Sequence, residues 1–473
     1  MNVPEHDVVI IGAGPAGISA ALMASSCGLK TLLLDEQPRP GGQIYRNITR
    51  VSRSVAELLG PDYRHGAALT TQLARSGVEV HQGALVWDVA QGFTITAQMD
   101  GRSYQVRARQ LIVASGAMER PSPLPGWTLP GVMNAGAAQI LLKSSGSVPA
   151  GRVVMAGGGP LLLLVACQLL EAGVTLAGIV ETSSRANWWR ALRHLPTALG
   201  APAYLAKGVQ MLLRLRRAGV PMFAAATGLC IEGKQAAQGL SFTHAGLAKR
   251  LDADLVLLHH GVVPNTRIGQ LLRVEHHWDK VQLSLRPRVD VWGASSLAGF
   301  RIAGDSAGIA GALAAECSGA LAALGAARDL GHLSESECNQ RSAPIRQRLA
   351  AQLRIRPFLD ALYRPPEWLS NPSDNTIVCR CEEVTAGRIR EMAQLGCQGP
   401  NQTKFFSRCG MGPCQGRLCG LTVTQMLAGS LGKRPDEIGF YRVRAPLKPV
   451  RLASLAALAQ PTATDEIETT ETT

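Results

Sequence analysis

The segment at residues 7–17, DVVIIGAGPAG, constrains the fold of this chain more than any other stretch. Its apolar, β-branched run at residues 8–11 predicts a buried parallel strand. Gly12, Gly14 and Gly17 follow with the spacing of a phosphate-binding turn. In such a turn the three glycines permit a tight bend, close approach of a pyrophosphate, and close packing of helix on strand.

The residues after the glycines complete a nucleotide-binding pattern. A helix predicted over residues 15–26 begins with Pro15 and Ala16, and its free N–H groups would face the phosphates. The next predicted strand ends at Asp35 and Glu36, where an acidic residue holds a ribose hydroxyl in such folds. We expect Asp35 in that role. The alternative is a glycine-rich turn in an α/β fold that binds nothing.

Three later motifs could contact the same dinucleotide. A glycine pair after the second strand would bring backbone close to a flavin, a strand that stops at small residues would pass under it, and an aspartate would accept from ribityl hydroxyls. The aspartate could instead simply cap the helix that follows. The residues concerned are Gly42 and Gln43, Ala114, Ser115 and Gly116, and Gly304 and Asp305.

A second strand–glycine–helix pattern begins near residue 152. Gly159 and Pro160 correspond to Gly14 and Pro15, but Leu162 occupies the third glycine position. A leucine there should push the helix away from the strand. We therefore expect a second nucleotide-type domain that binds NAD(P), binds another adenine nucleotide, or serves only as scaffold.

These patterns predict an α/β chain with two Rossmann-like domains, the second inserted in the first, and a small helical C-terminal domain. Residues 78–114 additionally read as an antiparallel meander. The length of 473 residues suits about three domains. The expected boundaries of the first Rossmann-like domain are 1–122 with 288–335, and those of the inserted domain are 123–287, with a helical insert at 184–222. A linker is expected at 336–375, the C-terminal domain at 376–430, and an extended tail at 431–473, disordered from Pro461 on.

Composition narrows the class of partner. The net charge is +13, but the basic residues are scattered with few aromatics among them, so we expect no nucleic-acid partner. The first strand leaves no room for a signal peptide, and the apolar run at 161–180 is interrupted near Glu171. We expect a cytoplasmic protein; peripheral association with the inner membrane stays open.

Six of the eleven cysteines fall between residues 379 and 419. In a cytoplasmic chain such clustering indicates metal or redox chemistry rather than disulfides. Cys379 and Cys381 would point the same way from an extended segment. Cys409, Cys414 and Cys419 are spaced so that either C-x4-C pair could complete four thiolates. Beside a flavin, an iron–sulfur cluster fits this arrangement better than the alternative, zinc.

The glycine loops and the Gly-Asp motif resemble the flavoprotein superfamily with two dinucleotide domains. No CxxC pair precedes residue 379, which disfavours disulfide reduction. CRCEEVT at 379–385 and GMGPCQGRLCG at 410–420 are more closely similar to the larger subunit of opine oxidases. Hydrogen cyanide synthase and proline, hydroxyproline and amine dehydrogenases share this pattern. The resemblance implies [2Fe–2S] ligands at Cys379, Cys381, Cys414 and Cys419, with Cys409 free.

The same resemblance implies a division of labour. A smaller, D-amino-acid-oxidase-like FAD subunit would oxidise the amine, and this chain would pass the electrons through FAD and [2Fe–2S] to a respiratory acceptor. It also implies FMN at the subunit contact. No obvious amine-binding base is present, so no catalytic residue is assigned. Two alternatives stay open: a stand-alone NAD(P)H-dependent ferredoxin or acceptor reductase, and a scaffold subunit without cofactors.

Overall fold

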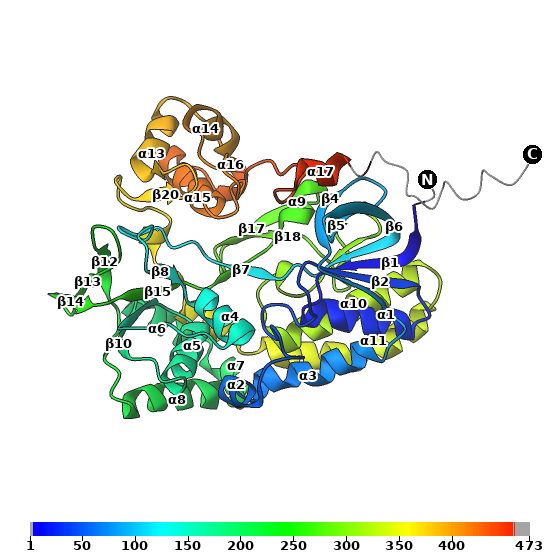
Figure 1. The fold of residues 1–473 in the computed structure, drawn as a ribbon, viewed down its shortest axis with the longest axis horizontal. Helices are drawn as coiled ribbons and strands as arrows, with labels where there is room; N and C mark the ends of the chain where they lie inside the picture. The colour runs from blue at the N-terminus through cyan, green and yellow to red at the C-terminus, as the bar shows by residue number, and fades with distance from the viewer. Residues whose placement is uncertain (1–2, 457, 459–473) are drawn as a thin grey trace, which may run out of the picture.

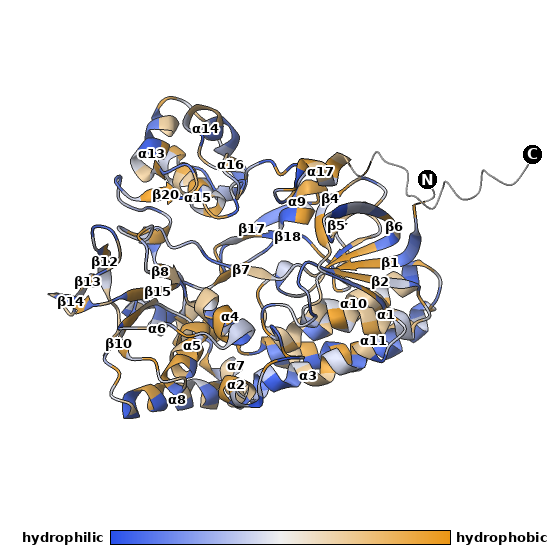
Figure 2. Cartoon of the chain, in the orientation of Figure 1, coloured by the Kyte–Doolittle hydropathy of each residue, from blue (hydrophilic) through white to orange (hydrophobic). Residues whose placement is uncertain are grey.

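The computed structural model describes residues 3–456 and 458. Two α/β units lie side by side in Figure 1, one around the blue strands and the other around the cyan and green strands. A small helical unit, coloured orange, lies above them. Apolar residues concentrate in the central strands and on the inner faces of the helices in Figure 2, as burial of a shared core requires.

The first sheet has seven strands. They are β1 (Glu5–Ile11), β2 (Thr31–Asp35), β3 (Glu79–Gln82), β4 (Leu85–Val89), β5 (Thr94–Met99), β6 (Arg102–Val113) and β19 (Phe300–Ile302). The order is β3-β2-β1-β6-β5-β4, with β19 also paired to β6. Because β19 returns to β6 after nearly 200 residues, the second unit is enclosed in sequence by parts of the first.

The strand β3 corrects the predicted meander. We expected residues 78–81 to open an antiparallel set, but β3 pairs in parallel with β2, with Leu32 opposite Glu79. Only β4, β5 and the first part of β6 form the antiparallel arrangement. The reason is the helix that precedes β3, since a crossover helix returns the chain to a parallel position.

The helices of the first unit cover one face of this sheet (Figure 1). They are α1 (Pro15–Ser26), α2 (Arg53–Leu59), α3 (Pro61–Ala74), α10 (Ala312–Asp329) and α11 (Glu335–Leu353). The helix α1 spans the residues predicted for it. It packs closely on α10, where a methyl group at Gly319 would lie 1.9 Å from the carbonyl oxygen of Ala16.

The second unit is built on a five-stranded parallel sheet in the order β11-β10-β9-β15-β8. Its strands and helices are β8 (Val132–Asn134), α4 (Ala135–Ser145), β9 (Val153–Gly157), α5 (Pro160–Glu171), β10 (Leu176–Glu181), α6 (Arg185–Leu192), α7 (Leu195–Leu199), α8 (Pro202–Arg217), β11 (Met222–Phe223) and β15 (Leu255–His259). The helices α6, α7 and α8 lie within residues 184–222. Leu162 is buried against the sheet.

Smaller elements complete the two units, among them a three-stranded sheet of β12, β13 and β14 that packs on the second unit. They are β7 (Ala117–Glu119), β12 (Thr227–Glu232), β13 (Gly239–His244), β14 (Leu247–Asp252), β16 (Val262–Pro264), α9 (Arg267–Leu271), β17 (His276–Asp279), β18 (Ser284–Pro287) and the 3-10 helix η1 (Gly304–Ser306). The pairing of β7 with β16 is antiparallel and connects the two large sheets.

The C-terminal part begins with α12 (Arg356–Leu362) and the 3-10 helix η2 (Glu367–Leu369). The cysteine-bearing unit follows, with β20 (Ile377–Cys379), β21 (Val384–Thr385), α13 (Ala386–Gln394), α14 (Pro400–Ser407), α15 (Gly420–Leu431) and α16 (Pro435–Ile438). The chain then returns to the first sheet, where the Leu447 amide donates to the Trp87 carbonyl. The helix α17 (Leu452–Ala456) contacts β6, and its Ser454 hydroxyl donates to the Gly101 carbonyl before that strand (Figure 1). The disorder predicted from Pro461 on lies outside the described residues.

Among the described residues, no helix is both long enough and apolar enough to cross a membrane.

Candidate cofactor sites

The first glycine loop has the close packing that its sequence predicts. A methyl group at Gly12 would lie 2.4 Å from the Ala114 carbonyl oxygen, and one at Gly17 would lie 1.7 Å from the Gly12 carbonyl oxygen. Gly42, at φ +60°, approaches the Gly14 Cα so closely that a side chain would collide with it. The loop after β2 is thus folded over the loop after β1, and only glycines fit there.

The start of α1 has the features of an anion-binding helix end. Gly14 precedes the helix without a side-chain cap, and Pro15 and Ala16 form its first turn. The helix therefore keeps unpaired N–H groups and the positive end of its dipole. Arg46 lies near Asp35 at the end of β2, and its Nε is buried without a hydrogen-bond partner in the described residues. An orphaned guanidinium N–H beside a glycine cradle fits a dinucleotide with its phosphates.

Asp35 ends β2 as predicted, and its carboxylate is engaged by the backbone. It accepts from the Ala13 amide at 2.5 Å and the Gln37 amide at 2.7 Å. Burial raises the pKa of Asp35, while these two bonds act in the opposite direction. Glu36 is exposed and pairs with Lys448 from the C-terminal tail. Asp35 thus fixes the turn, and Glu36 faces the surface.

The remaining motifs of the first unit meet at the ends of β6 and β19. Ser115 donates to the Asn265 carbonyl at 3.0 Å, and the Asn265 amide donates to Gly116. Gly304 opens η1, and one oxygen of Asp305 accepts from the amides of Ala310 and Gly311.

The second oxygen of the Asp305 carboxylate takes no part in these bonds. Asp305 can therefore cap the following helix with one oxygen and accept from a ligand hydroxyl with the other. Gln43 donates to the Ala117 carbonyl on the other side of the loop.

Two ring side chains from later in the sequence lie next to the second glycine loop. The His259 ring lies 3.5 Å from where a methyl group would stand at Gly159, at the start of α5 before Pro160. Its Nδ1 is 2.7 Å from Glu119. Tyr363, from just after α12, lies 3.7 Å from the corresponding position at Gly158.

Tyr363 also faces the acid of this second unit. Burial raises the pKa of Tyr363, and the nearby Glu181 carboxylate raises it further. His259 therefore lies next to the expected position of a pyrophosphate, and Tyr363 lies next to that of a ribose. No local sequence pattern predicts either contact.

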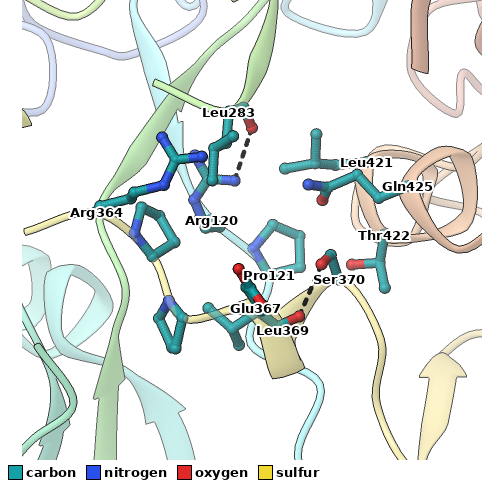
Figure 3. Close-up of a pocket in the computed structure, with 12 residues that line it drawn as sticks. Arg120, Pro121, Leu283, Arg364, Glu367, Leu369, Ser370, Leu421, Thr422 and Gln425 are labelled. Carbon is teal, nitrogen blue, oxygen red and sulfur yellow. Dashed lines mark hydrogen bonds between the residues drawn. The ribbon is translucent and has the colours of Figure 1, made fainter. Parts of the chain in front are cut away.

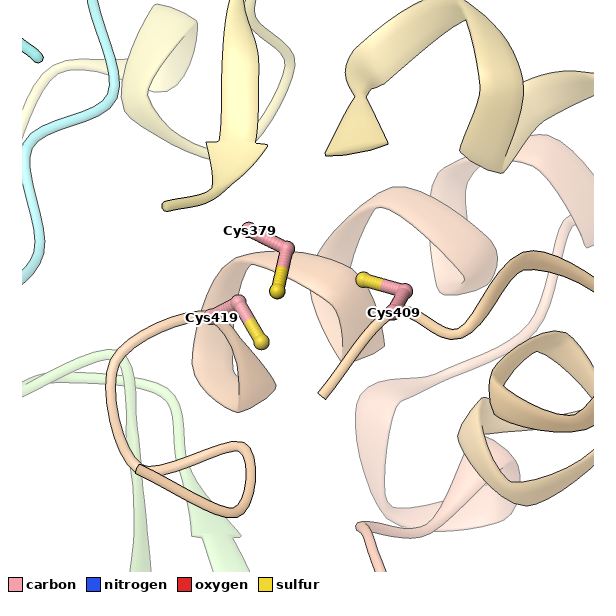
Figure 4. Close-up of side chains that lie close together, drawn as sticks. All are labelled: Cys379, Cys409 and Cys419. Atoms are coloured by element: carbon pink, nitrogen blue, oxygen red, sulfur yellow. The ribbon is translucent and has the colours of Figure 1, made fainter. Parts of the chain in front are cut away.

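Three cysteines converge in the C-terminal unit. The sulfurs of Cys379, Cys409 and Cys419 lie within 4.8 Å of one another, and all three residues are buried. Figure 4 shows their thiols pointing toward a common centre from β20, the loop after α14, and the start of α15. The pKa of Cys379 is lowered because it accepts from the other two thiols, and Gly410 donates to its sulfur at 3.3 Å. A buried group of thiols with one stabilised as thiolate fits a metal or iron–sulfur centre.

Cys381 and Cys414 form a second pair beside this group. Cys381 is exposed and Cys414 is half-buried. The backbone amide and the thiol of Cys414 both interact with the Cys381 thiol. The structure thus gathers the four predicted ligands in one region, but the tightest group contains Cys409 in place of Cys381 and Cys414.

The role of Arg267 was not predicted from the sequence. This residue begins α9 and donates to both the backbone and the side-chain oxygen of Gln415, next to Cys414. A lone arginine at the start of a short helix carries no pattern that predicts a contact almost 150 residues away.

Comparisons with known proteins agree with this arrangement. Residues 6–319 match the family described as pyridine nucleotide-disulphide oxidoreductase, and residues 373–459 match the sarcosine oxidase A3 domain. In the solved structures, L-proline dehydrogenase from P. horikoshii superimposes with a TM-score of 0.71 at 16% identity, covering 96% of this chain and 80% of that one. This likeness concerns the fold.

Two relatives cover nearly the whole chain. The A subunit of opine oxidase from Rhizobium meliloti is 44% identical over 96% of this chain and 88% of its own length. The HcnB subunit of hydrogen cyanide synthase from Pseudomonas protegens is 32% identical over 93% of this chain and 96% of its own. The chain therefore belongs to the family of opine oxidase A subunits and is an oxidoreductase flavoprotein of the pyridine nucleotide-disulphide type.

Proposed function

We propose that this chain is the electron-transfer subunit of a heteromeric dehydrogenase that oxidises opines or amino acids at their C–N bond. The observation that carries the proposal is the junction of its two candidate redox sites. Ser115 and Gly116 bind Asn265, and two residues later Arg267 binds Gln415 beside Cys414. Relatives named as subunits of opine oxidase and hydrogen cyanide synthase support the same assignment.

The first unit would hold FAD. Gly12, Gly14 and Gly17 would let the pyrophosphate reach the start of α1. Asp35 and Glu36 would accept hydrogen bonds from the ribose hydroxyls. The other contacts would come from Pro15, Ala16, Gly42, Gln43, Ala114, Ser115, Gly116, Gly304 and Asp305. Close backbone approach at Gly12 and Gly42 supports this placement.

The C-terminal unit would hold [2Fe–2S] through Cys379, Cys381, Cys414 and Cys419. Backbone N–H groups near the sulfurs, such as that of Gly410, would stabilise the additional negative charge of the reduced cluster. When bound, FAD supplies a two-electron carrier and the cluster a one-electron carrier.

The partner would be a smaller, D-amino-acid-oxidase-like FAD subunit. There the amine would lose one C–H and one N–H bond and become an imine, releasing two electrons and two protons. The residues of this chain would orient the carriers that receive those electrons, with FMN at the subunit contact. A respiratory component at the inner membrane would be the final acceptor, and the protein itself would be cytoplasmic.

A stand-alone NAD(P)H-dependent reductase is the main competing function. It requires a dinucleotide on the loop containing Gly159 and Pro160. The proximity of His259 and Tyr363 to that loop argues against such a ligand, because both rings lie beside the glycines that a pyrophosphate would approach. We therefore propose that the second unit does not use NAD(P)H as a reductant.

The test is expression of the chain alone and together with its D-amino-acid-oxidase-like partner. The complex should reduce an artificial acceptor with an opine or amino acid, whereas the chain alone should oxidise neither amines nor NAD(P)H at a comparable rate. Rapid NAD(P)H oxidation by the single chain would support the reductase instead. A purified chain without flavin and iron would contradict both functions and favour a scaffold role.

A further inference from the structure

A cavity of about 180 Å³ lies where three segments of the chain meet. One wall is Arg120 and Pro121, just after β7, and another is the stretch from Arg364 to Ser370. The first two turns of α15 close the third side with Thr422 and Gln425. Figure 3 shows the guanidinium groups of both arginines on the Leu283 side of the cavity, across from α15.

Arg120 is a buried cation without a carboxylate. Its side chain is only 5% exposed, and it donates to the carbonyls of Gln282 at 2.6 Å and Leu283 at 2.9 Å. Its Nε is buried and makes no hydrogen bond within the described part of the chain. Burial, and then the charge of Arg364, lower the pKa of Arg120 to about 10, so the group still carries its proton at neutral pH.

Arg364 places a second positive charge at the same cavity. It donates to the Lys280 carbonyl at 2.9 Å. Among the described residues, the hydrogen bonds of both guanidinium groups go to backbone carbonyls and not to carboxylates. Glu367 is the acidic member of the lining, and it is exposed. Two neighbouring guanidinium groups with no bound carboxylate are unfavourable unless an anion neutralises them.

We propose that this cavity binds a small oxyanion, either the carboxylates of a short organic acid or a phosphate group. Guanidinium groups bind both in a charge-assisted, often bidentate geometry. The N-terminal end of α15 adds a favourable dipole on the opposite side. The anion would bridge the segment after β7, the linker and α15, and so hold the cysteine-bearing unit against the second α/β unit.

The test is calorimetric titration of the purified, cofactor-loaded full chain with sodium phosphate and with sodium malonate, against sodium chloride at equal ionic strength. Saturable binding of either anion is expected, and the preferred one identifies the source. Arg364→Met removes one charge, and Gln425→Glu puts a carboxylate at the opposite wall. Each should weaken binding by about tenfold or more.

The matched control is Arg53→Met, which removes an arginine that is 93% exposed on α2, away from the cavity. It should bind like the unmodified chain. Circular dichroism spectra in chloride should agree among all four proteins, because none of the three substitutions replaces a core side chain. Absence of saturable binding, or equal affinity in the Arg364 and Gln425 variants and the unmodified chain, would overturn the proposal.

Discussion

Arg267 joins the candidate flavin site to the cysteine loop by donating twice to Gln415, at 3.2 Å to the carbonyl and 2.9 Å to Oε1. Gln415 has φ +50° and itself donates to the Pro446 carbonyl. The bond therefore fixes the loop of Cys414 against α9, whose preceding residues contact Ser115 and Gly116. Electron carriers on either side would be held in a constant arrangement.

Arg267→Gln should lower the midpoint potential of the bound cluster by tens of millivolts, because a positive charge beside Cys414 stabilises the more negative, reduced state. A redox titration followed by electron paramagnetic resonance measures this shift. Arg53→Gln is the control, since it removes an equal charge from an exposed site on another helix. An unchanged potential would mean that Arg267 is not near the cluster.

Gly17→Ala should prevent flavin binding and destabilise the first unit by about 1–3 kcal/mol or more, because the added methyl group meets the Gly12 carbonyl oxygen at 1.7 Å. The helix α1 would have to move away from β1 and carry its N–H groups out of position. Flavin absorbance per chain and urea denaturation measure the two effects.

The matched control for this substitution is Gly208→Ala. Gly208 lies inside α8, and nothing stands within 4 Å of the added methyl group. This change should leave flavin content unaltered and raise stability by about 0.5–1 kcal/mol, since alanine favours the helix. If Gly17→Ala retained its flavin, the proposed role of the first loop would be wrong.

The buried Lys143 should make the free energy of unfolding depend on pH. It lies in α4 and donates to the Gln43 carbonyl at 3.1 Å and to Gln139 Oε1 at 3.0 Å. Burial, followed by the charge of Arg46, lowers its pKa to about 7. The unfolded chain holds this proton up to a pKa of about 10.4. Between these values the unfolded state binds more protons, so the free energy of unfolding rises with pH.

The slope from this group can reach about 1.4 kcal/mol per pH unit and disappears below about pH 7, where both states are protonated. Urea denaturation at several values from pH 7 to 9 should show the rise. Lys143→Met should flatten it, whereas Lys249→Met, an exposed position on β14, should not. Equal slopes in all three proteins would show that Lys143 stays charged in the folded state.

The contrast between predicted and missed features follows sequence distance. The elements β1, α1 and β2 were predictable because the apolar run, the glycines and Asp35 lie within thirty residues and specify one local unit. The contacts of Tyr363 with Gly158, and of Arg267 with Gln415, join segments separated by 148 to 205 residues. Such contacts depend on how whole units pack, and no periodicity or spacing encodes them.

The cysteine ligands were likewise predicted only in part. Their number and clustering were evident from the sequence, but C-x4-C spacing did not distinguish Cys409 from Cys419 as the partner of Cys414. The family resemblance implies Cys414, whereas proximity in the structure groups Cys409 with Cys379 and Cys419. A ligand set chosen by the bound cluster can differ from the thiols that are closest without it. Cys381 and Cys414 lie on two separate loops, and neither residue is fully buried.

Serine substitutions should decide between the two sets. We expect Cys379→Ser, Cys381→Ser, Cys414→Ser and Cys419→Ser each to lower iron content sharply and to remove the paramagnetic signal after dithionite reduction. Cys409→Ser should keep both, because its thiol would only pack beside the cluster. Cys230→Ser, at a half-buried cysteine on β12, is the control and should behave like the unmodified chain. Iron lost from Cys409→Ser but kept in Cys414→Ser would instead make Cys409 the ligand, and the family pattern would not hold at this position.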